Sequence, residues 1–218
     1  MRSNTEVIDI IYKRKSTRNY SLDFRIDKET QEKILKAGLQ APSPKNRQPW
    51  HYVVVDDHKT LKKVQATMEE ALTHLKSERV FQKRDFSDLS MAFETAKIIG
   101  QCSMLVFVCY ERDESNEHGE VMQWPLSAAA FEVADIQAIG ACVQNMLLTA
   151  CAIGIDSLWI ADVLYAYNEL SKMMMLKQPF VAAVAFGKAA QHQTPRKRLN
   201  EKMTRFSETD EIYEGSQL

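Results

Sequence analysis

The order of hydrophobic and polar positions predicts helices and strands that alternate along the chain. Apolar side chains spaced for one helical face occur over 5–13, and a second amphipathic stretch, 27–40, begins at Asp27, a predicted N-cap. Further helices are predicted over 58–75, 87–99 and 163–175, and strands over 51–57, 103–111, 155–161 and 180–187. This alternation predicts a layered α+β domain with three or four strands of modest length.

The longest helical pattern covers residues 126–152 and is apolar on nearly every side. At 1.5 Å per residue, this helix is about 40 Å long. Small residues recur along it, and Gly154 follows at a position typical of a helix C-cap. Because the helix lacks a polar face, we expect it to be buried, either within its own domain or against a partner.

Composition narrows the class of protein. With 218 residues and 45% hydrophobic content, we expect one domain over 1–200 and a polar tail over 201–218. A net charge of −1 argues against a polycation that binds nucleic acid or membranes. No apolar run reaches the roughly 18 residues of a membrane span, and Met1 to Glu6 lacks the apolar core of a signal peptide. The four cysteines form no CxxC motif, so we expect reduced core residues in a cytoplasmic protein.

The stretch KRKSTRNY, residues 13–20, gathers cations at the end of the first predicted helix. The chain has seven glycines and neither a GxGxxG nor a GxxxxGK[ST] motif, so any phosphate must be held by cationic side chains and a helix end. Arg14, Ser16 and Arg18 alternate, and an extended segment would point them the same way. Arginine offers paired donors that match phosphate oxygens. The alternative is a charged last turn that complements the helix dipole.

The stretch APSPKNRQPW, residues 41–50, holds three prolines and is predicted to be a stiff loop rather than a helix. Asn46 and Gln48 carry both donors and acceptors, which suits the polar edge of a planar ring, and Ser43 adds a hydroxyl. The alternative is a structural loop that leads into the next strand, with Trp50 in the core.

A second basic stretch, PRKR, occupies residues 195–198. The usual fate of such a run is a solvated tail. Arg196 and Arg198 can also lie beside the first basic cluster, because a dianion between them screens their mutual repulsion.

These motifs resemble the FMN-dependent nitroreductase family. KRKSTRNY resembles its Arg-x-Ser-x-Arg motif, and APSPKNRQPWHYVVV its Ala-Pro-Ser-x-x-Asn-x-Gln-Pro-Trp loop and following strand. AIGACVQNMLLTACAIGIDSLWI is similar to the family's central helix and the turn after it, and PRKRL to its C-terminal basic element. The four occur in the family's order from about residue 8 to about residue 200. The resemblance implies a layered α+β dimer with a mostly antiparallel central sheet and FMN sites at the subunit interface.

The resemblance also implies roles for particular residues. The phosphate and ribityl end of FMN would be held by Arg14, Lys15, Ser16, Arg18, Arg196 and Arg198. The isoalloxazine ring would be lined by Pro42, Ser43 and Asn46, typically from the other subunit. The turn from Trp159 to Ala161, with Ile160 between them, would offer a backbone N–H near flavin N5. This chain reads WIAD where many members have a Glu-Gly or Gly-Gly pair, so the N5 contact depends on how this turn folds without glycine.

The implied activity is an oxidoreductase that passes hydride from NADH or NADPH through FMN to a nitroaromatic, a quinone or an activated alkene. Trp124 is a candidate for the substrate side of the flavin or for the core, and 76–85 for a lid or an exposed connector. The alternatives are a flavin storage or sensor protein, a reductive dehalogenase or flavin-degrading relative, and an anion- or RNA-binding module, which the net charge disfavours. We expect a homodimer that binds no metal and has neither nucleic acid nor membrane as a partner.

Overall fold

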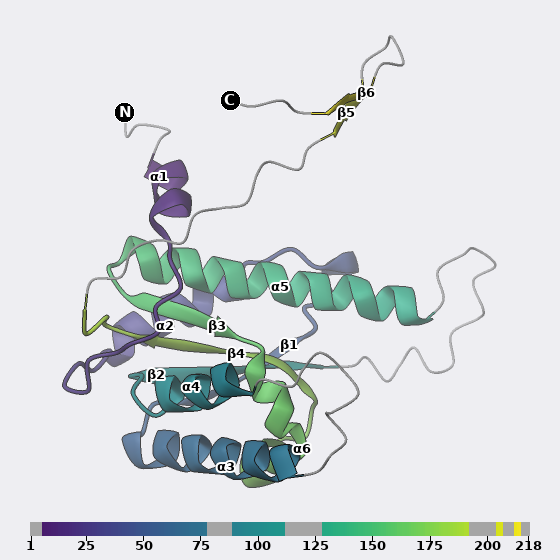
Figure 1. Cartoon of the computed structure of the whole chain (residues 1–218). Coiled ribbons are helices and arrows are strands. Elements are labelled where there is room, and N and C mark those ends of the chain that lie inside the picture. The colour runs from purple at the N-terminus through teal and green to yellow at the C-terminus, as the bar shows by residue number, and fades with distance from the viewer. Residues whose placement is uncertain (1–5, 78–88, 112–127, 192–203, 207–211, 215–218) are drawn as a thin grey trace.

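A four-stranded antiparallel sheet forms the centre of the molecule (Figure 1). The computed structural model describes residues 6–77, 89–111, 128–191, 204–206 and 212–214. The strand order is β1-β2-β4-β3. The strands are β1 (Trp50–Val55), β2 (Met104–Tyr110), β3 (Asp156–Ile160) and β4 (Phe180–Gly187). The predicted α+β fold with an antiparallel sheet is therefore confirmed, and every predicted strand is present.

The two central strands are the most apolar segments of the sheet. All seven residues of β2 are buried, and β4 pairs with it in the register Val106↔Val184. Successive side chains of a strand point to opposite faces. Leu105, Phe107 and Cys109 accordingly belong to one buried cluster, while Met104, Val106 and Val108 belong to the other. A strand that is apolar on both faces needs cover on both, and the helices provide it.

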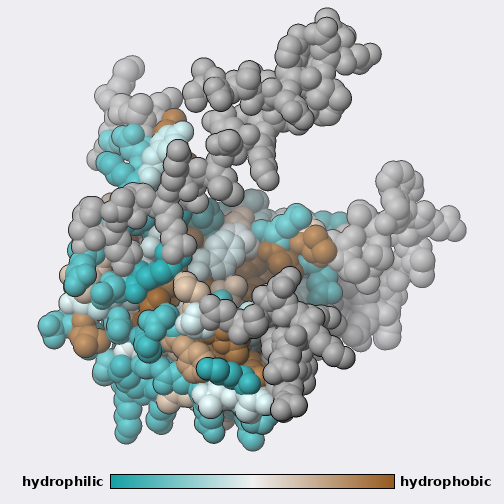
Figure 2. All heavy atoms as spheres, in the orientation of Figure 1, coloured by the Kyte–Doolittle hydropathy of each residue, from teal (hydrophilic) through white to brown (hydrophobic). Residues whose placement is uncertain are grey.

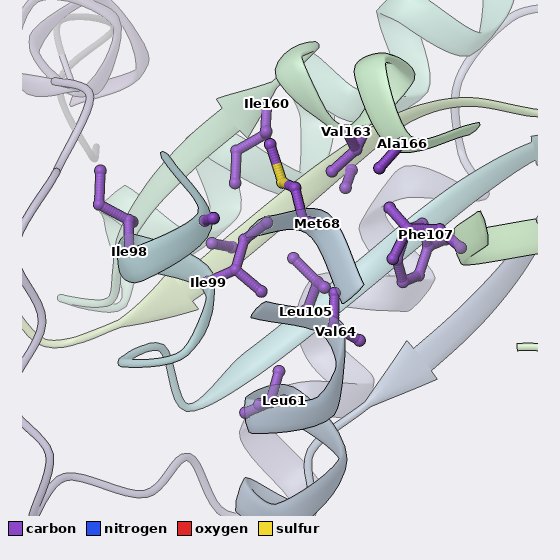
Figure 3. Close-up of a cluster of buried hydrophobic side chains, with 14 of the residues drawn as sticks. Leu61, Val64, Met68, Ile98, Ile99, Leu105, Phe107, Ile160, Val163 and Ala166 are labelled. Atoms are coloured by element: carbon purple, nitrogen blue, oxygen red, sulfur yellow. The ribbon is translucent and has the colours of Figure 1, made fainter. Parts of the chain in front are cut away.

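Three helices cover one face of the sheet: α3 (His58–Ser77), α4 (Ser90–Ile99) and α6 (Tyr167–Met173). The 3-10 segment η4 (Asp162–Ala166) leads into α6, so the single helix predicted over 163–175 is divided in two. Figure 3 shows the core on this side, where Leu61 and Met68 of α3 meet Ile99 of α4 and Phe107 of β2. This layer contains none of the predicted cofactor-binding residues except Ile160.

The opposite face is covered by α5 (Ala128–Ala152) and α2 (Lys28–Gly38). Asp27 caps α2 as predicted, because its carboxylate accepts the Thr30 N–H at 2.8 Å. The two helices approach closely at Gly38, where a β-carbon would lie 2.6 Å from the Tyr52 hydroxyl and 2.9 Å from Cγ of Met146. Any larger residue there would require these neighbouring side chains to shift.

The long helix α5 ends as the sequence predicts. Gly154 has φ +77°, a conformation that glycine adopts without steric cost. The Ile155 N–H donates to the Ala150 carbonyl at 2.8 Å, and the Gly154 N–H to the Cys151 carbonyl at 3.2 Å. This pair of bonds is a Schellman cap, which stops the helix and turns the chain into β3.

Parts of α5 and α1 (Glu6–Lys13) leave apolar side chains exposed in the single chain. Val133 and Ile136 of α5 are 56% and 38% exposed, and Figure 2 shows apolar side chains at the surface along this helix. None of the residues of α1 is buried, and Figure 1 shows the helix projecting from the layers. No helix in the described ranges combines the length and apolarity that a membrane span requires.

The cysteines match their predicted role. All four are free thiols, and Cys102, Cys109 and Cys142 are buried while Cys151 is half-buried. Burial raises the pKa of Cys102 to about 12 and that of Cys109 and Cys142 to about 11. These three are inert core thiols.

The sequence did not predict two local features. The proline-rich stretch contains one short 3-10 turn, η1 (Pro44–Asn46), although it forms no longer helix. The region predicted as a tail includes an antiparallel pair, β5 (Thr204–Phe206) and β6 (Ile212–Glu214). The expected domain boundary near residue 200 and most of the candidate lid over 76–85 lie outside the described residues and stay predictions.

Candidate functional site

The basic segment after α1 is fixed to the end of the sheet by its own backbone. The Arg14 N–H closes the last turn of the helix on the Ile10 carbonyl at 2.9 Å. The chain then extends beside β3, where Ser16 forms a parallel bridge with Ser157 and the Thr17 N–H donates to the Ser157 carbonyl at 2.9 Å. Residues 16–17 therefore form a short edge addition to the sheet.

Thr17 decides which way this segment faces. Its side chain is fully buried, and its hydroxyl donates to Oδ1 of Asp156 at 3.4 Å. In extended backbone the residues on either side of Thr17 point to the other face, so Ser16 and Arg18 share a side. Both are half-exposed, and Nη1 of Arg18 donates to the Ser16 carbonyl at 3.4 Å. A hydroxyl and a guanidinium are thus held together on one outer face.

Tyr20 anchors the far end of the segment. Its ring is 2% exposed and lies over Gly187, where a β-carbon would be 2.7 Å from Cδ1 of the tyrosine. Its hydroxyl donates to the Ala185 carbonyl at 3.1 Å, and burial raises its pKa well above the usual value. The Ser21 N–H donates to the Lys188 carbonyl at 2.8 Å. The segment is consequently tied to the exit of β4 as well as to β3.

Asp156 connects the basic segment with the segment that leaves β4. Its Oδ1 accepts the Thr17 hydroxyl, and its Oδ2 accepts the Ala189 N–H at 2.9 Å. The Ala190 N–H adds a bond to the Asn19 carbonyl at 3.1 Å. The segment that leaves β4 toward the second basic stretch therefore starts beside the first. Arg196 and Arg198 themselves, like Trp124, lie outside the described residues.

The electrostatics of Cys151 report where the cations gather. Burial raises the pKa of this thiol, and the positive charges of Arg14, Lys13 and Lys15 oppose that rise, while Asp156 adds to it. Cys151 is in the last turn of α5. The positive charges of these three residues therefore lie near the C-terminal end of α5, where they complement the dipole of that helix. A gathering of guanidinium and ammonium groups of this kind has the donors that anions prefer.

The proline-rich loop is strained. Lys45, Asn46 and Gln48 have φ values of 51°, 55° and 51°. This conformation costs residues such as lysine and glutamine about 1–2 kcal/mol each, although asparagine tolerates it better, and it persists only where the surroundings fix it. Within the loop the Gln48 N–H donates to Oγ of Ser43 at 2.9 Å, and Trp50 is buried at 6% exposure. The predicted core role of Trp50 is confirmed, while Pro42 and Asn46 are exposed and Ser43 is half-exposed.

A buried ion pair fastens this loop to α5. Nη2 of Arg47 lies 2.5 Å and Nε lies 3.2 Å from Oδ1 of Asp135, and the two side chains are only 15% and 8% exposed. The Tyr110 hydroxyl donates to Oδ2 of the same carboxylate at 3.4 Å. The sequence analysis missed this contact. The available signal was a carboxylate within a helix that is otherwise nearly apolar.

The turn after β3 is built without glycine. Ile160 is buried in the core, Ala161 is exposed, and the Thr95 hydroxyl donates to Oδ2 of Asp162 at 2.7 Å. The Leu164 N–H donates to the Ala161 carbonyl at 2.9 Å, which begins η4. Because the Ile160 side chain packs inward, residue 160 can offer a ligand only its backbone, while Ala161 is exposed. Trp159 is 44% exposed and packs near Gly140 of α5.

The basic segment and the proline-rich loop are far apart in one chain. The loop leads into β1 and the basic segment borders β3, at the two opposite edges of the sheet. Along α5 the loop is tied to Asp135 and the cations surround Cys151, sixteen residues later, which is about 24 Å of helix. One copy therefore does not bring the two groups together.

The model of the Nitroreductase family matches residues 11–188. The chain belongs to the nitroreductase family. A protein of Archaeoglobus fulgidus named "Putative NADH dehydrogenase/NAD(P)H nitroreductase" is 32% identical over 173 residues, which is 79% of this chain and 75% of that protein. Membership confirms the family resemblance and the predicted enzyme class, an oxidoreductase.

Solved structures share this nitroreductase fold. A crystal structure from Desulfovibrio desulfuricans described as a "putative nitroreductase in complex with FMN" is 25% identical, covers 91% of this chain and 94% of its own, and gives a TM-score of 0.63. A nitroreductase with bound FMN from Desulfitobacterium hafniense is 20% identical, covers 95% of this chain and 100% of its own, and gives a TM-score of 0.68. At 20% identity, the similarity to the Desulfitobacterium hafniense structure supports only the shared fold.

Proposed function

We propose that this nitroreductase-family oxidoreductase binds FMN and uses NADH or NADPH to reduce an electron-poor acceptor. When bound, FMN supplies hydride transfer at N5, from the nicotinamide to a nitroaromatic, a quinone or an activated alkene. The chain's own residues bind and orient the partners of that reaction. Their fit to FMN rests on the donor set of the basic segment.

The basic segment would hold the phosphate. Ser16 and Arg18 share an outer face, and Arg14 and Lys15 belong to the cation cluster beside Cys151. A hydroxyl and several cations on a backbone that is already fixed suit a dianion, because little order remains to be imposed on binding. Arg196 and Arg198 would complete the clamp. Gln191, the last described residue before them, directly follows Ala190, which is bonded to Asn19.

A second copy of the chain would supply the ring contacts. Pro42, Ser43 and Asn46 lie at the opposite edge of the sheet from the basic segment, so their partner flavin would be the one held by another copy. The exposed apolar residues of α5 and α1 would be covered in such a homodimer. The backbone at Ile160 and Ala161 would lie near flavin N5, and Trp124 remains a candidate for the acceptor side.

One observation carries the proposal. The buried Thr17 fixes the backbone of 16–17 to β3, so that Ser16 and Arg18 face outward together beside the cation cluster. A basic run that is merely exposed to solvent at a helix end does not need side chains held in one fixed orientation. This fixed direction supports the proposed binding role of the segment.

The test is the spectrum of the purified protein and its response to reductant. We expect the visible absorption of bound flavin and its anaerobic bleaching within seconds by NADH or NADPH. Protein that stays colourless after incubation with FMN would overturn the proposal. Flavin that binds and stays oxidised with both nicotinamides would favour a storage or sensor protein.

A further inference from the structure

An ion pair between Arg47 and Asp135 joins the proline-rich loop to α5. Nε and Nη2 of the guanidinium both contact Oδ1 of Asp135, and the Tyr110 hydroxyl donates to Oδ2 of the same carboxylate. Paired donors of this kind fix direction as well as distance. The arginine thus sets both the position and the orientation of the loop relative to α5.

The loop needs contacts with the rest of the protein because its own backbone conformation is strained. Arg47 stands between Asn46 and Gln48, which both have left-handed φ values. An unrestrained chain would leave this region for ordinary backbone geometry. The bond from the Gln48 N–H to Ser43 closes the loop on itself but does not attach it to the body of the protein. Attachment comes from Arg47 on one side, and on the other from the buried Trp50 and from the Pro49 carbonyl, which accepts the Glu111 N–H at 3.1 Å.

We propose that Arg47 and Asp135 are positioning residues for the flavin site, since they hold the loop in the shape that presents Ser43 and Asn46 to the ring. This inference rests on the proposed function. Neither residue touches the flavin in this account. Arg47 acts through the backbone on both sides of it, and Asp135 acts through Arg47.

The competing explanation is that the Arg47–Asp135 pair only stabilises the fold, and experiment can distinguish this from a positioning role. Buried ion pairs contribute little net stability, and replacing both partners by apolar residues of similar volume is often neutral. The double variant Arg47→Met/Asp135→Leu removes both charges and leaves neither partner buried alone. The variant also removes the Asp135 acceptor of the Tyr110 hydroxyl, a long bond of 3.4 Å. Its thermal midpoint should therefore fall only slightly below that of the wild type, whereas the loop loses the contact that holds its strained backbone in place.

The experiment measures FMN affinity, thermal midpoint and the visible circular dichroism of bound flavin for wild type, Arg47→Lys, the double variant and Lys28→Met. Lys28→Met is the matched control, because Lys28 pairs with Asp56 at the exposed surface. We expect the double variant to bind FMN about tenfold more weakly, the scale of ordering two contact side chains on binding, with altered flavin dichroism and little change in midpoint. Arg47→Lys keeps the charge but loses the paired donors, and should fall between.

Three outcomes decide the matter. Wild-type affinity and dichroism in both the double variant and Arg47→Lys would overturn the positioning role while leaving the proposed function intact. Loss of affinity only in proportion to a lowered midpoint, in Arg47→Lys as in the double variant, would also overturn it in favour of a structural role. A wild-type protein that does not bind FMN would overturn the proposed function and this inference together.

Discussion

The basic segment and the proline-rich loop are both irregular connections, yet they are held in opposite ways. Residues 14–21 are fixed mainly by backbone hydrogen bonds to β3 and the exit of β4, with Thr17 and Tyr20 buried beneath them. Residues 42–48 keep a strained backbone that the side chain of Arg47 ties to α5. A segment held by its backbone tolerates changes to its outward side chains without losing shape. A loop held through a side chain loses its shape with that side chain.

The largest expected effect tests the charges of the basic segment. Arg14→Ala with Arg196→Ala should weaken FMN binding by ~3–6 kcal/mol, because two charge-assisted contacts of about 1.5–3 kcal/mol each are removed. This corresponds to about two to four powers of ten in Kd, measured by flavin fluorescence titration. The control is Lys33→Ala with Lys36→Ala, which removes two cations from exposed pairs on α2. Equal affinity in the two double variants would show that the clamp is misassigned.

A smaller effect tests the backbone anchor of the same segment. In Gly187→Ala the new methyl would lie 2.7 Å from the Tyr20 ring, which is buried at 2% exposure. We expect a loss of ~2–3 kcal/mol in the free energy of unfolding from urea titration, together with weaker FMN binding.

Gly154→Ala is the matched control for that anchor. It meets no atom within 4 Å but must adopt φ +77°, so it should lose about 1 kcal/mol of stability and keep its FMN affinity. Unchanged FMN affinity in Gly187→Ala would show that the packing of Tyr20 does not contribute to the FMN site.

On the side of the loop, Gly38→Ala tests the close approach of α2 to α5. The methyl would lie 2.6 Å from the Tyr52 hydroxyl and 2.9 Å from Cγ of Met146, and the flexible methionine can relieve part of the clash. We expect a loss of ~1–2 kcal/mol in the free energy of unfolding. Gly140→Ala is the comparison, since its methyl would make an ordinary 3.7 Å contact with Trp159. A neutral Gly38→Ala would contradict the packing described at this position.

The smallest expected effect is on the alkylation rate of Cys151, which tests whether FMN binds beside the cations of the basic segment. Burial keeps Cys102, Cys109 and Cys142 protonated and shielded, whereas Cys151 is half-buried and faces Arg14, Lys13 and Lys15. Iodoacetamide at about pH 8 should therefore modify Cys151 first, and FMN should slow that reaction because it covers the cluster. Mass spectrometry of the alkylated peptides measures both. A reaction rate that FMN leaves unchanged would place the flavin away from this end of α5.

Much of this architecture could be predicted from the sequence because it is local. The unbroken apolar run of β2 predicts a strand covered on both faces, and Gly154 predicts the end of α5. The contacts that shape the site join residues far apart in the chain. Thr17 and Asp156 are 139 positions apart, and Arg47 and Asp135 are 88 apart. Such pairs depend on how strands, loops and helices are arranged in space, and no local sequence pattern contains that information.

Hybrid dimers test the shared site most directly. One copy carries Arg14→Ala/Arg196→Ala, its partner carries Ser43→Ala/Asn46→Ala, and two different affinity tags isolate the mixed pair for FMN titration. If each site combines the basic segment of one copy with the loop of the other, one site keeps both intact parts, so the account predicts one FMN bound per dimer with wild-type affinity. A hybrid in which no site binds with wild-type affinity would mean that each copy builds its site alone, and would contradict the account.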